Sequence, residues 1–402
     1  MKAITRTIWI LSFVSLFTDL ASEMLYPVMP IYLKTIGFTA FSIGVLEGLA
    51  EAVSSISKGY FGKLSDNTGI RAPFVKTGYA LSAVSKPLLA VFTGVYSIFF
   101  LRTADRLGKG LRTGARDAIL ADESAHSDRG KVFGFHRSMD TLGAAIGPAF
   151  ALIYLYLNPG IYKPLFLFSF IPGIVAVSLT MMVTDSSRKG SDKTIIRRKV
   201  KLNFTNLNYW RMSTAAYRKL VAGLLFFALF NSSDMFLILK LKESGIGDIT
   251  VIAIYIFYNA VYALSAFPLG MLADKLGLKK MFLTGIALFA IVYLGMAFGH
   301  SFVIYGLLFL LYGLYYGCTE GIAKAWITLL CNANEKATAI GVFSGLQGIA
   351  AFMASAFAGF MWYSYGFRVA FVITSAAAVV VFFYLLLNTS AIAGMQANRK
   401  ES

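Results

Sequence analysis

The chain has 402 residues, of which 57% are hydrophobic and only 14% are charged, and its formal net charge is +17. Soluble domains are typically about a quarter charged, so this composition excludes an ordinary soluble protein and indicates a chain that uses lipid as its solvent. The net charge does not indicate nucleic-acid binding, because the basic residues cluster in short connections between apolar segments. Lys and Arg in such connections fix membrane topology.

Twelve apolar segments are long enough to be membrane-spanning helices, which need about 20 residues. The predicted spans are 9–34, 41–63, 72–93, 96–120, 135–157, 163–184, 219–241, 248–272, 281–299, 302–330, 339–363 and 367–389. The first is predicted to be a retained helix, because no small-residue cleavage site of a signal peptide is evident. Connections after even-numbered spans are basic, whereas those after odd-numbered spans are nearly free of basic charge, which predicts cytoplasmic termini.

One loop motif occurs twice, as GKLSDNTGIRAP at Gly62–Pro73 and as GMLADKLGLKKM at Gly270–Met281, 208 residues later. In both copies a glycine precedes the aspartate by four residues and another glycine follows it by three. A repeat at half the chain length predicts two fused six-helix bundles, residues 1–184 and 219–402. The basic stretch 185–218 between them is predicted to be a cytoplasmic linker that lies on anionic lipid headgroups.

Ionisable residues inside the predicted spans are costly and are usually functional. Asp19 and Glu23 lie one turn apart in the first span, as do Glu320 and Lys324 in the tenth, and Asp234 lies in the seventh. The fourth span is unusually charged and contains Arg102, Asp105, Arg106, Lys109, Arg112, Arg116 and Asp117. At ~100° per residue, all of these except Arg112 lie within about 60° of one line along the helix. That face is predicted to meet water, acidic partners or substrate, not lipid.

The doubled motif, the twelve spans and the basic middle loop together resemble the major facilitator superfamily of transporters over nearly the whole chain. The resemblance implies an all-α membrane protein whose two six-helix bundles are related by pseudo-twofold symmetry, and a monomer. It also implies that the motif residues form gates on the cytoplasmic face, namely Gly62, Asp66, Gly69, Gly270, Asp274 and Gly277. Arg116 is interpreted as a gate or topology residue. The first copy offers only Arg71 as a basic partner for its aspartate, so its charge pairing is the less certain of the two.

The segment GAAIGP at Gly143–Pro148 resembles a glycine-rich family motif associated with antiporters, but it is also typical of a packing and bending site. An enzyme is not expected, since no GxxxxGK[ST] motif and no Ser/His/Asp or metal-ligand constellation is visible. No cofactor is expected, and neither a disulfide nor a metal site is expected at Cys318 and Cys331.

In the resembled family, spans 1, 4, 7 and 10 line the central cavity. The resemblance therefore makes Arg102, Arg106, Lys109, Arg112, Asp234, Glu320 and Lys324 candidate substrate-binding residues. Because guanidinium groups bind carboxylate and phosphate bidentately, the cationic face predicts an anionic or zwitterionic substrate. Asp19 and Glu23 are candidates for proton coupling. Alternatively, these charges pair with one another: Asp19 and Glu23 with arginines of the fourth span, and Glu320 with Lys324.

The predicted function is secondary active transport of a small metabolite by proton-coupled alternating access, in what is predicted to be a bacterial cytoplasmic (inner) membrane. The alternatives are a proton-driven exporter of drugs or metabolites, working as an antiporter, and a lipid flippase. Tyr312, Tyr315 and Tyr316 are interpreted as packing or interface aromatics.

Overall fold

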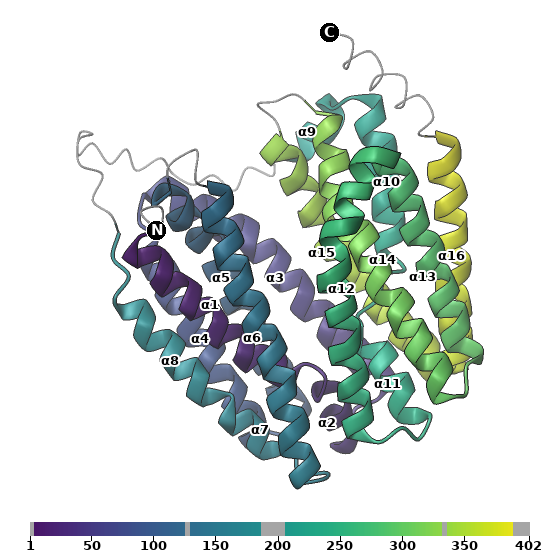
Figure 1. Cartoon of the computed structure of the whole chain (residues 1–402), viewed down its shortest axis with the longest axis horizontal. Coiled ribbons are helices and arrows are strands. Elements are labelled where there is room, and N and C mark those ends of the chain that lie inside the picture. The colour runs from purple at the N-terminus through teal and green to yellow at the C-terminus, as the bar shows by residue number, and fades with distance from the viewer. Residues whose placement is uncertain (1–3, 125–128, 186–205, 332–335, 389–402) are drawn as a thin grey trace. The chain divides into compact units, whose positions relative to one another are not determined.

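The computed structural model describes residues 4–124, 129–185, 206–331 and 336–388, and every regular element in these ranges is a helix (Figure 1). The helices of the amino-terminal half are α1 (Arg6–Leu25), α2 (Met29–Thr35), α3 (Ala40–Thr68), α4 (Ala72–Val91), α5 (Val95–Asp122), α6 (Arg129–Leu157), α7 (Lys163–Phe168) and α8 (Phe170–Met181). Those that follow are α9 (Asn206–Met212), α10 (Ala215–Ala228), α11 (Met235–Glu243), α12 (Asp248–Leu276), α13 (Leu278–Phe298), α14 (Phe302–Leu329), α15 (Lys336–Tyr365) and α16 (Phe367–Asn388). Each of the twelve predicted spans corresponds to one long helix or to a pair of consecutive helices.

The helices form two compact units. The first contains Met1–Phe38 and Leu49–Leu202, and the second contains Thr39–Gly48 and Asn203–Ser402. The first turns of α3 belong to the second unit because they pack closely on α15: Gly359 of α15 is so near that a Cβ there would lie 2.6 Å from the carbonyl oxygen of Ala40.

The spacing of 208 residues extends well beyond the loop motif. Helix α3 covers Ala40–Thr68 and α12 covers Asp248–Leu276, so both bounds differ by 208 residues. The same spacing separates the end of α2 at Thr35 from the end of α11 at Glu243. The repeat inferred from one loop is therefore a repeat of the whole helix pattern.

The first, sixth and seventh predicted spans are each interrupted, the sixth at Ser169 between α7 and α8, which the sequence analysis did not anticipate. Helix α1 stops before Pro27, and Pro30 lies at the start of α2, because proline lacks the amide that would continue the helical hydrogen bonds. Between α10 and α11 lies the polar run 231–234, whose short side chains compete with the backbone for hydrogen bonds. The Ser233 hydroxyl, for instance, accepts from the backbone amide of Met235 at 3.4 Å.

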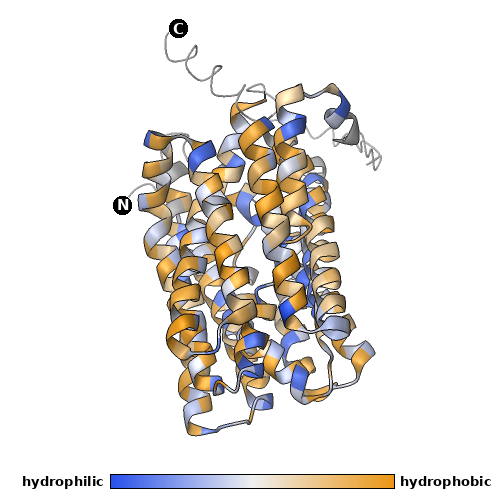
Figure 2. Ribbon diagram, turned by 90° about the vertical axis from the view of Figure 1, so that its right-hand side faces the viewer, coloured by the Kyte–Doolittle hydropathy of each residue, from blue (hydrophilic) through white to orange (hydrophobic). Residues whose placement is uncertain are grey.

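Nine helices in the described part of the chain are long and apolar enough to cross a membrane. The predicted spans outside this group are α4, whose hydropathy is lowered by Lys76 and Lys86, the highly charged α5, and the interrupted α10–α11 pair. Hydrophobic residues dominate the long helices of both units (Figure 2). Large apolar side chains such as Phe100, Leu264 and Phe267 are more than 70% exposed, as a surface solvated by lipid allows. The chain is thus a multi-pass membrane protein.

Glycines allow several helices of the first unit to approach one another closely. Gly143 and Gly147, both in the GAAIGP segment of α6, lie against the backbone of α1, and a Cβ at Gly147 would be 2.6 Å from the carbonyl oxygen of Leu20. In the same way, a Cβ at Gly114 of α5 would be 2.8 Å from the Cα atom of Gly62 in α3. These close approaches set the positions of the charged residues on α1, α5 and α6.

Candidate functional site

A buried ion-pair network joins α4 and α5 in the first unit. Lys86 Nζ lies 3.0 Å from Asp105 Oδ1, and Arg102 Nη1 lies 3.5 Å from Asp105 Oδ2. The three side chains are each at most 7% exposed. Ser82 completes the network, since its hydroxyl donates to Asp105 and also lies 2.8 Å from Lys86 Nζ. Arg102 is thereby held inside the protein by a carboxylate of its own helix.

Arg112 faces α4. Its guanidinium carbon lies 4.4 Å from the centre of the Tyr79 ring, which is a cation–π contact, and the side chain is buried. Its Nη1 atom has no hydrogen-bond partner within the described ranges. The position of Arg112 away from the line of the other charges on this span is consistent with this separate location.

Arg106 and Lys109 remain more accessible than Arg102 and Arg112. Lys109 is exposed and Arg106 is half-buried. Neither forms an ion pair with a carboxylate of the residues that the structure describes. Lys109 lies near enough to Asp19 to interact electrostatically with its carboxyl group. Like the buried Arg112, these two cations thus have no carboxylate partner among the described residues, but they are the more accessible ones.

A carboxyl pair lies where α1 packs on α6. The carboxyl groups of Asp19 and Asp140 lie close enough to interact electrostatically, and the Ser15 hydroxyl donates to Asp140. Arg137 Nη1 lies 3.2 Å from Asp140 Oδ2. Glu23, the other candidate on α1, is half-buried one turn beyond Asp19. Asp140 was absent from the predicted site residues. Its position as a charged residue within the fifth span was a visible signal that it could interact with the charges of neighbouring spans.

Arg116 connects the same region to α5. Its Nη1 atom donates to Ser15 Oγ at 3.2 Å, while its Nε and Nη2 atoms bond Asp117 Oδ1 at 3.0 and 2.9 Å. The guanidinium group is thus one hydrogen bond removed from Asp140, through Ser15. This arrangement places Arg116 beside the carboxyl pair.

The second unit contains a carboxylate held by three tyrosines. Asp234, at the interruption between α10 and α11, accepts hydrogen bonds from the hydroxyls of Tyr312 at 2.6 Å, Tyr316 at 2.8 Å and Tyr258 at 2.9 Å. Two of the three tyrosines come from α14 and one comes from α12. Sequence reasoning treated Tyr312 and Tyr316 as packing aromatics; their spacing of four residues on one helix face was the signal that both could reach one group.

Glu320 and Lys324 lie further along α14. Tyr262 donates a hydrogen bond to Glu320, and both Glu320 and Lys324 are exposed. No ion pair joins Glu320 to Lys324 among the described residues. A cavity of about 430 Å³ opens beside them, lined by Tyr262 and Tyr316 together with mostly apolar residues of α12, α13 and α14.

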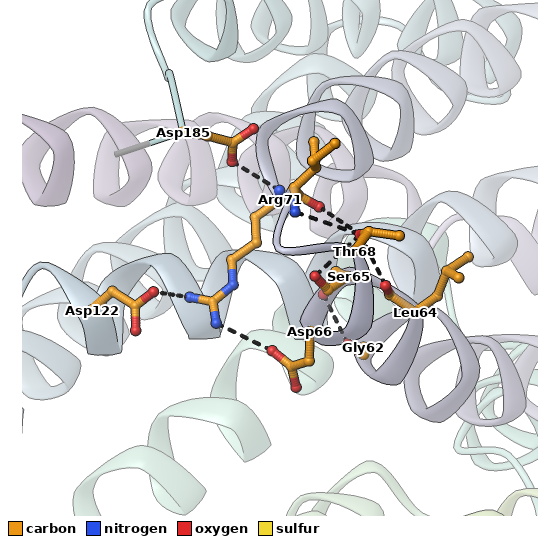
Figure 3. Close-up of polar contacts among 9 residues, drawn as sticks. Gly62, Leu64, Ser65, Asp66, Thr68, Arg71, Asp122 and Asp185 are labelled. Atoms are coloured by element: carbon orange, nitrogen blue, oxygen red, sulfur yellow. Dashed lines mark hydrogen bonds and ion pairs between the residues drawn. The ribbon is translucent and has the colours of Figure 1, made fainter. Parts of the chain in front are cut away.

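The first copy of the loop motif is held by a polar network around Arg71 (Figure 3). Arg71 Nη2 lies 3.2 Å from Asp66 Oδ1, and Nη1 pairs with Asp122 at the end of α5. Asp185 accepts from the backbone amides of Arg71 and Ala72, each at 2.8 Å. Gly69 turns the chain with a φ of +68°, a conformation that favours glycine. Arg71, the basic residue that follows the motif aspartate in this copy, thus bonds that aspartate directly.

The second copy is organised differently. Gly277 has a φ of +95° and ends α12, as its counterpart Gly69 ends α3. Lys279 Nζ donates to the carbonyl oxygen of Leu386 near the end of α16, at 2.9 Å. Gly270 lines the cavity of the second unit, and its missing side chain leaves open space. The side chain of Asp274 lies outside the described residues.

Two helical units with a repeated helix pattern, apolar outer surfaces and buried charged groups are typical of a membrane transporter. Comparison with known proteins supports this class of protein. The model of the Major Facilitator Superfamily matches residues 11–258 and 220–401. An MFS-type transporter of Methanocaldococcus jannaschii is 31% identical over 367 residues, which are 90% of this chain and 89% of the relative. The chain belongs to the major facilitator superfamily.

Solved structures show the same fold. The nucleoside transporter NupG matches with a TM-score of 0.78 over 95% of this chain and 99% of that one, at 14% identity. A bacterial homologue of the human lysosomal transporter Spinster, in an inward-facing and unoccupied conformation, matches with a TM-score of 0.77 over 95% and 96% of the two chains, also at 14% identity. At this identity the likeness concerns the fold alone.

Proposed function

We propose that this transporter moves a small anionic or zwitterionic metabolite by proton-coupled alternating access. The observation that carries the proposal is the division of the α5 cations: Arg102 is bound by Asp105, whereas Arg106 and Lys109 pair with no described carboxylate. Cations without a direct partner in a region of low dielectric attract carboxylate and phosphate groups strongly. A substrate with one such group would supply the missing partner.

Proton coupling is supported by the contact between Asp19 and Asp140. Two carboxylates that lie this close repel each other when both are ionised, which favours retention of a proton by one of them. Arg116 lies beside the pair through Ser15. A change in the distance between Arg116 and Asp140 during transport would change the proton affinity of the Asp19–Asp140 pair.

Transport measurements in proteoliposomes test both parts of the proposal. Arg106→Gln and Lys109→Gln should each reduce uptake of anionic metabolites at least tenfold, whereas Lys163→Gln, which alters an exposed lysine at the start of α7, should not. Asp19→Asn and Asp140→Asn should abolish accumulation driven by a pH gradient and retain exchange of substrate between the two sides. Accumulation by Asp19→Asn comparable to that of the unaltered protein would refute the proton role.

We also propose that both termini are cytoplasmic and that the membrane is a bacterial inner membrane. The basic connections after the even-numbered spans support this orientation. Labelling of a cysteine introduced at Lys163, in a variant without Cys318 and Cys331, provides the test: a reagent that cannot cross the membrane should label it from outside intact cells.

A further inference from the structure

We propose that Asp234 and its three tyrosines form a binding site for a protonated amine, so that the transported molecule carries an ammonium group. This inference rests on the proposed function and narrows it from an anionic or zwitterionic substrate to a zwitterionic one. It depends only on residues of the second unit, and therefore on contacts that differ from those assigned to the anionic group.

The direction of the hydrogen bonds determines what Asp234 and the tyrosines can recognise. A phenol has one proton, and Tyr258, Tyr312 and Tyr316 each donate theirs to Asp234. Their oxygen atoms can then only accept a hydrogen bond from any further group. A ligand that approaches these oxygens and the Asp234 carboxylate must therefore supply hydrogen-bond donors, as an ammonium group does.

The balance of charge favours a cation as well. Among the described residues, no Lys, Arg or His forms an ion pair with Asp234. Glu320 lies near enough to Asp234 to interact electrostatically with it, and this second carboxylate has the same sign of charge. A buried carboxylate without a cation is costly, and a bound ammonium group would remove that cost.

The aromatic rings provide a second kind of attraction. The centre of the Tyr316 ring lies 5.2 Å from that of Tyr312, 5.6 Å from that of Tyr262 and 6.3 Å from that of Tyr258. Clustered ring faces bind ammonium groups through cation–π interactions. Tyr262 and Tyr316 also line the 430 Å³ cavity, whose volume lies within the range of small-molecule sites.

An unpaired acceptor in the same interruption is an independent observation. The Oδ1 atom of Asn231 is buried and has no hydrogen-bond partner in the described part of the chain. Its Nδ2 atom donates to Tyr315, whose ring lies 5.0 Å from that of Tyr316. A buried acceptor without a donor costs free energy that a ligand with N–H groups can recover.

The experiment compares three probes of equal chain length, pentylamine, pentanoate and 5-aminopentanoate, by their effect on thermal unfolding of the purified full-length protein in detergent. The probes are tested up to about 50 mM, because a few polar contacts give millimolar affinity. Pentylamine and 5-aminopentanoate should raise the unfolding temperature, and Asp234→Asn should remove the effect of pentylamine while leaving that of pentanoate. Asn keeps the shape of Asp, so this variant is expected to fold, and its elution from a size-exclusion column checks that it does.

Glu51→Gln, which neutralises an exposed carboxylate of α3, is the control and should keep the response to pentylamine. Tyr312→Phe should weaken the response severalfold. The inference is overturned if no amine probe stabilises the protein, if Asp234→Asn responds to pentylamine as the unaltered protein does, or if sodium chloride replaces the amines in an Asp234-dependent way. If only pentanoate fails, so that it does not raise the unfolding temperature through Arg106 and Lys109, the result would instead count against the anionic part of the proposed function.

Discussion

Lys86 Nζ lies 3.0 Å from Asp105 Oδ1, and the two side chains are 5% and 7% exposed. Because Asp105 also bonds Arg102, a single carboxylate balances two buried cations. Removal of one member of a buried pair usually costs about 3–5 kcal/mol, since the other charge is left without compensation. The network thus supports the fold where α4 packs on α5.

Asp105→Asn should destabilise the protein more than Lys86→Met does. The first change leaves two buried cations without a carboxylate, whereas the second leaves Asp105 paired with Arg102. We expect losses of about 3–5 and about 1–3 kcal/mol, respectively. Chemical unfolding in a mild detergent measures both, and an equal loss in the two variants would contradict this account of the network.

Gly143→Ala should destabilise the protein by about 1–3 kcal/mol, because its new Cβ would overlap the carbonyl oxygen of Leu16 and push α1 away from α6. Proton-driven accumulation should fall with it, since the contact between Asp19 and Asp140 depends on this packing. Gly345→Ala in α15 is the matched control, because a Cβ there meets nothing within 4 Å. That control should stabilise the helix by up to about 1 kcal/mol. Similar effects of both changes on unfolding would refute the packing role.

Arg71→Gln should slow transport severalfold and change the unfolding free energy by less than about 1 kcal/mol, as is usual for exposed ion pairs. The carboxylates that Arg71 joins, Asp66 and Asp122, are 63% and 54% exposed. Initial uptake rates in proteoliposomes test the expectation. Lys63→Gln, an exposed cation two residues before Ser65 in the same helix, is the control and should transport normally. An unchanged rate in Arg71→Gln would argue against a gate at this loop.

Asp185→Ala should cost about 0.5–2 kcal/mol, the usual cost of losing a helix cap. Its carboxylate accepts from the first free amides of α4, those of Arg71 and Ala72, although it comes from a segment more than 100 residues away. Asp185→Asn should retain part of this stability, because the amide oxygen can still accept. Thermal unfolding of the three proteins should rank the alanine variant lowest.

The sequence predicted the spans and the repeat well because both depend on local hydropathy and on spacing along the chain. It did not predict the interruptions at Pro27 and at 231–234, because the length of each apolar run concealed them. The charges of the fourth span, apart from Arg112, were treated as one face, yet the structure distributes them among different partners. Arg102 pairs with Asp105, Arg112 stacks on Tyr79, and Arg116 bonds Asp117 and Ser15.

The sequence by itself determined that this protein is a two-part helical membrane transporter, since apolar length and an internal repeat are properties of the chain alone. Only the tertiary structure decided which charges have a direct partner of opposite charge and which do not. Ion pairs and hydrogen bonds act over a few ångströms between residues far apart in the chain, such as Ser15 with Asp140 and Tyr312 with Asp234. Helix packing alone brings such partners together.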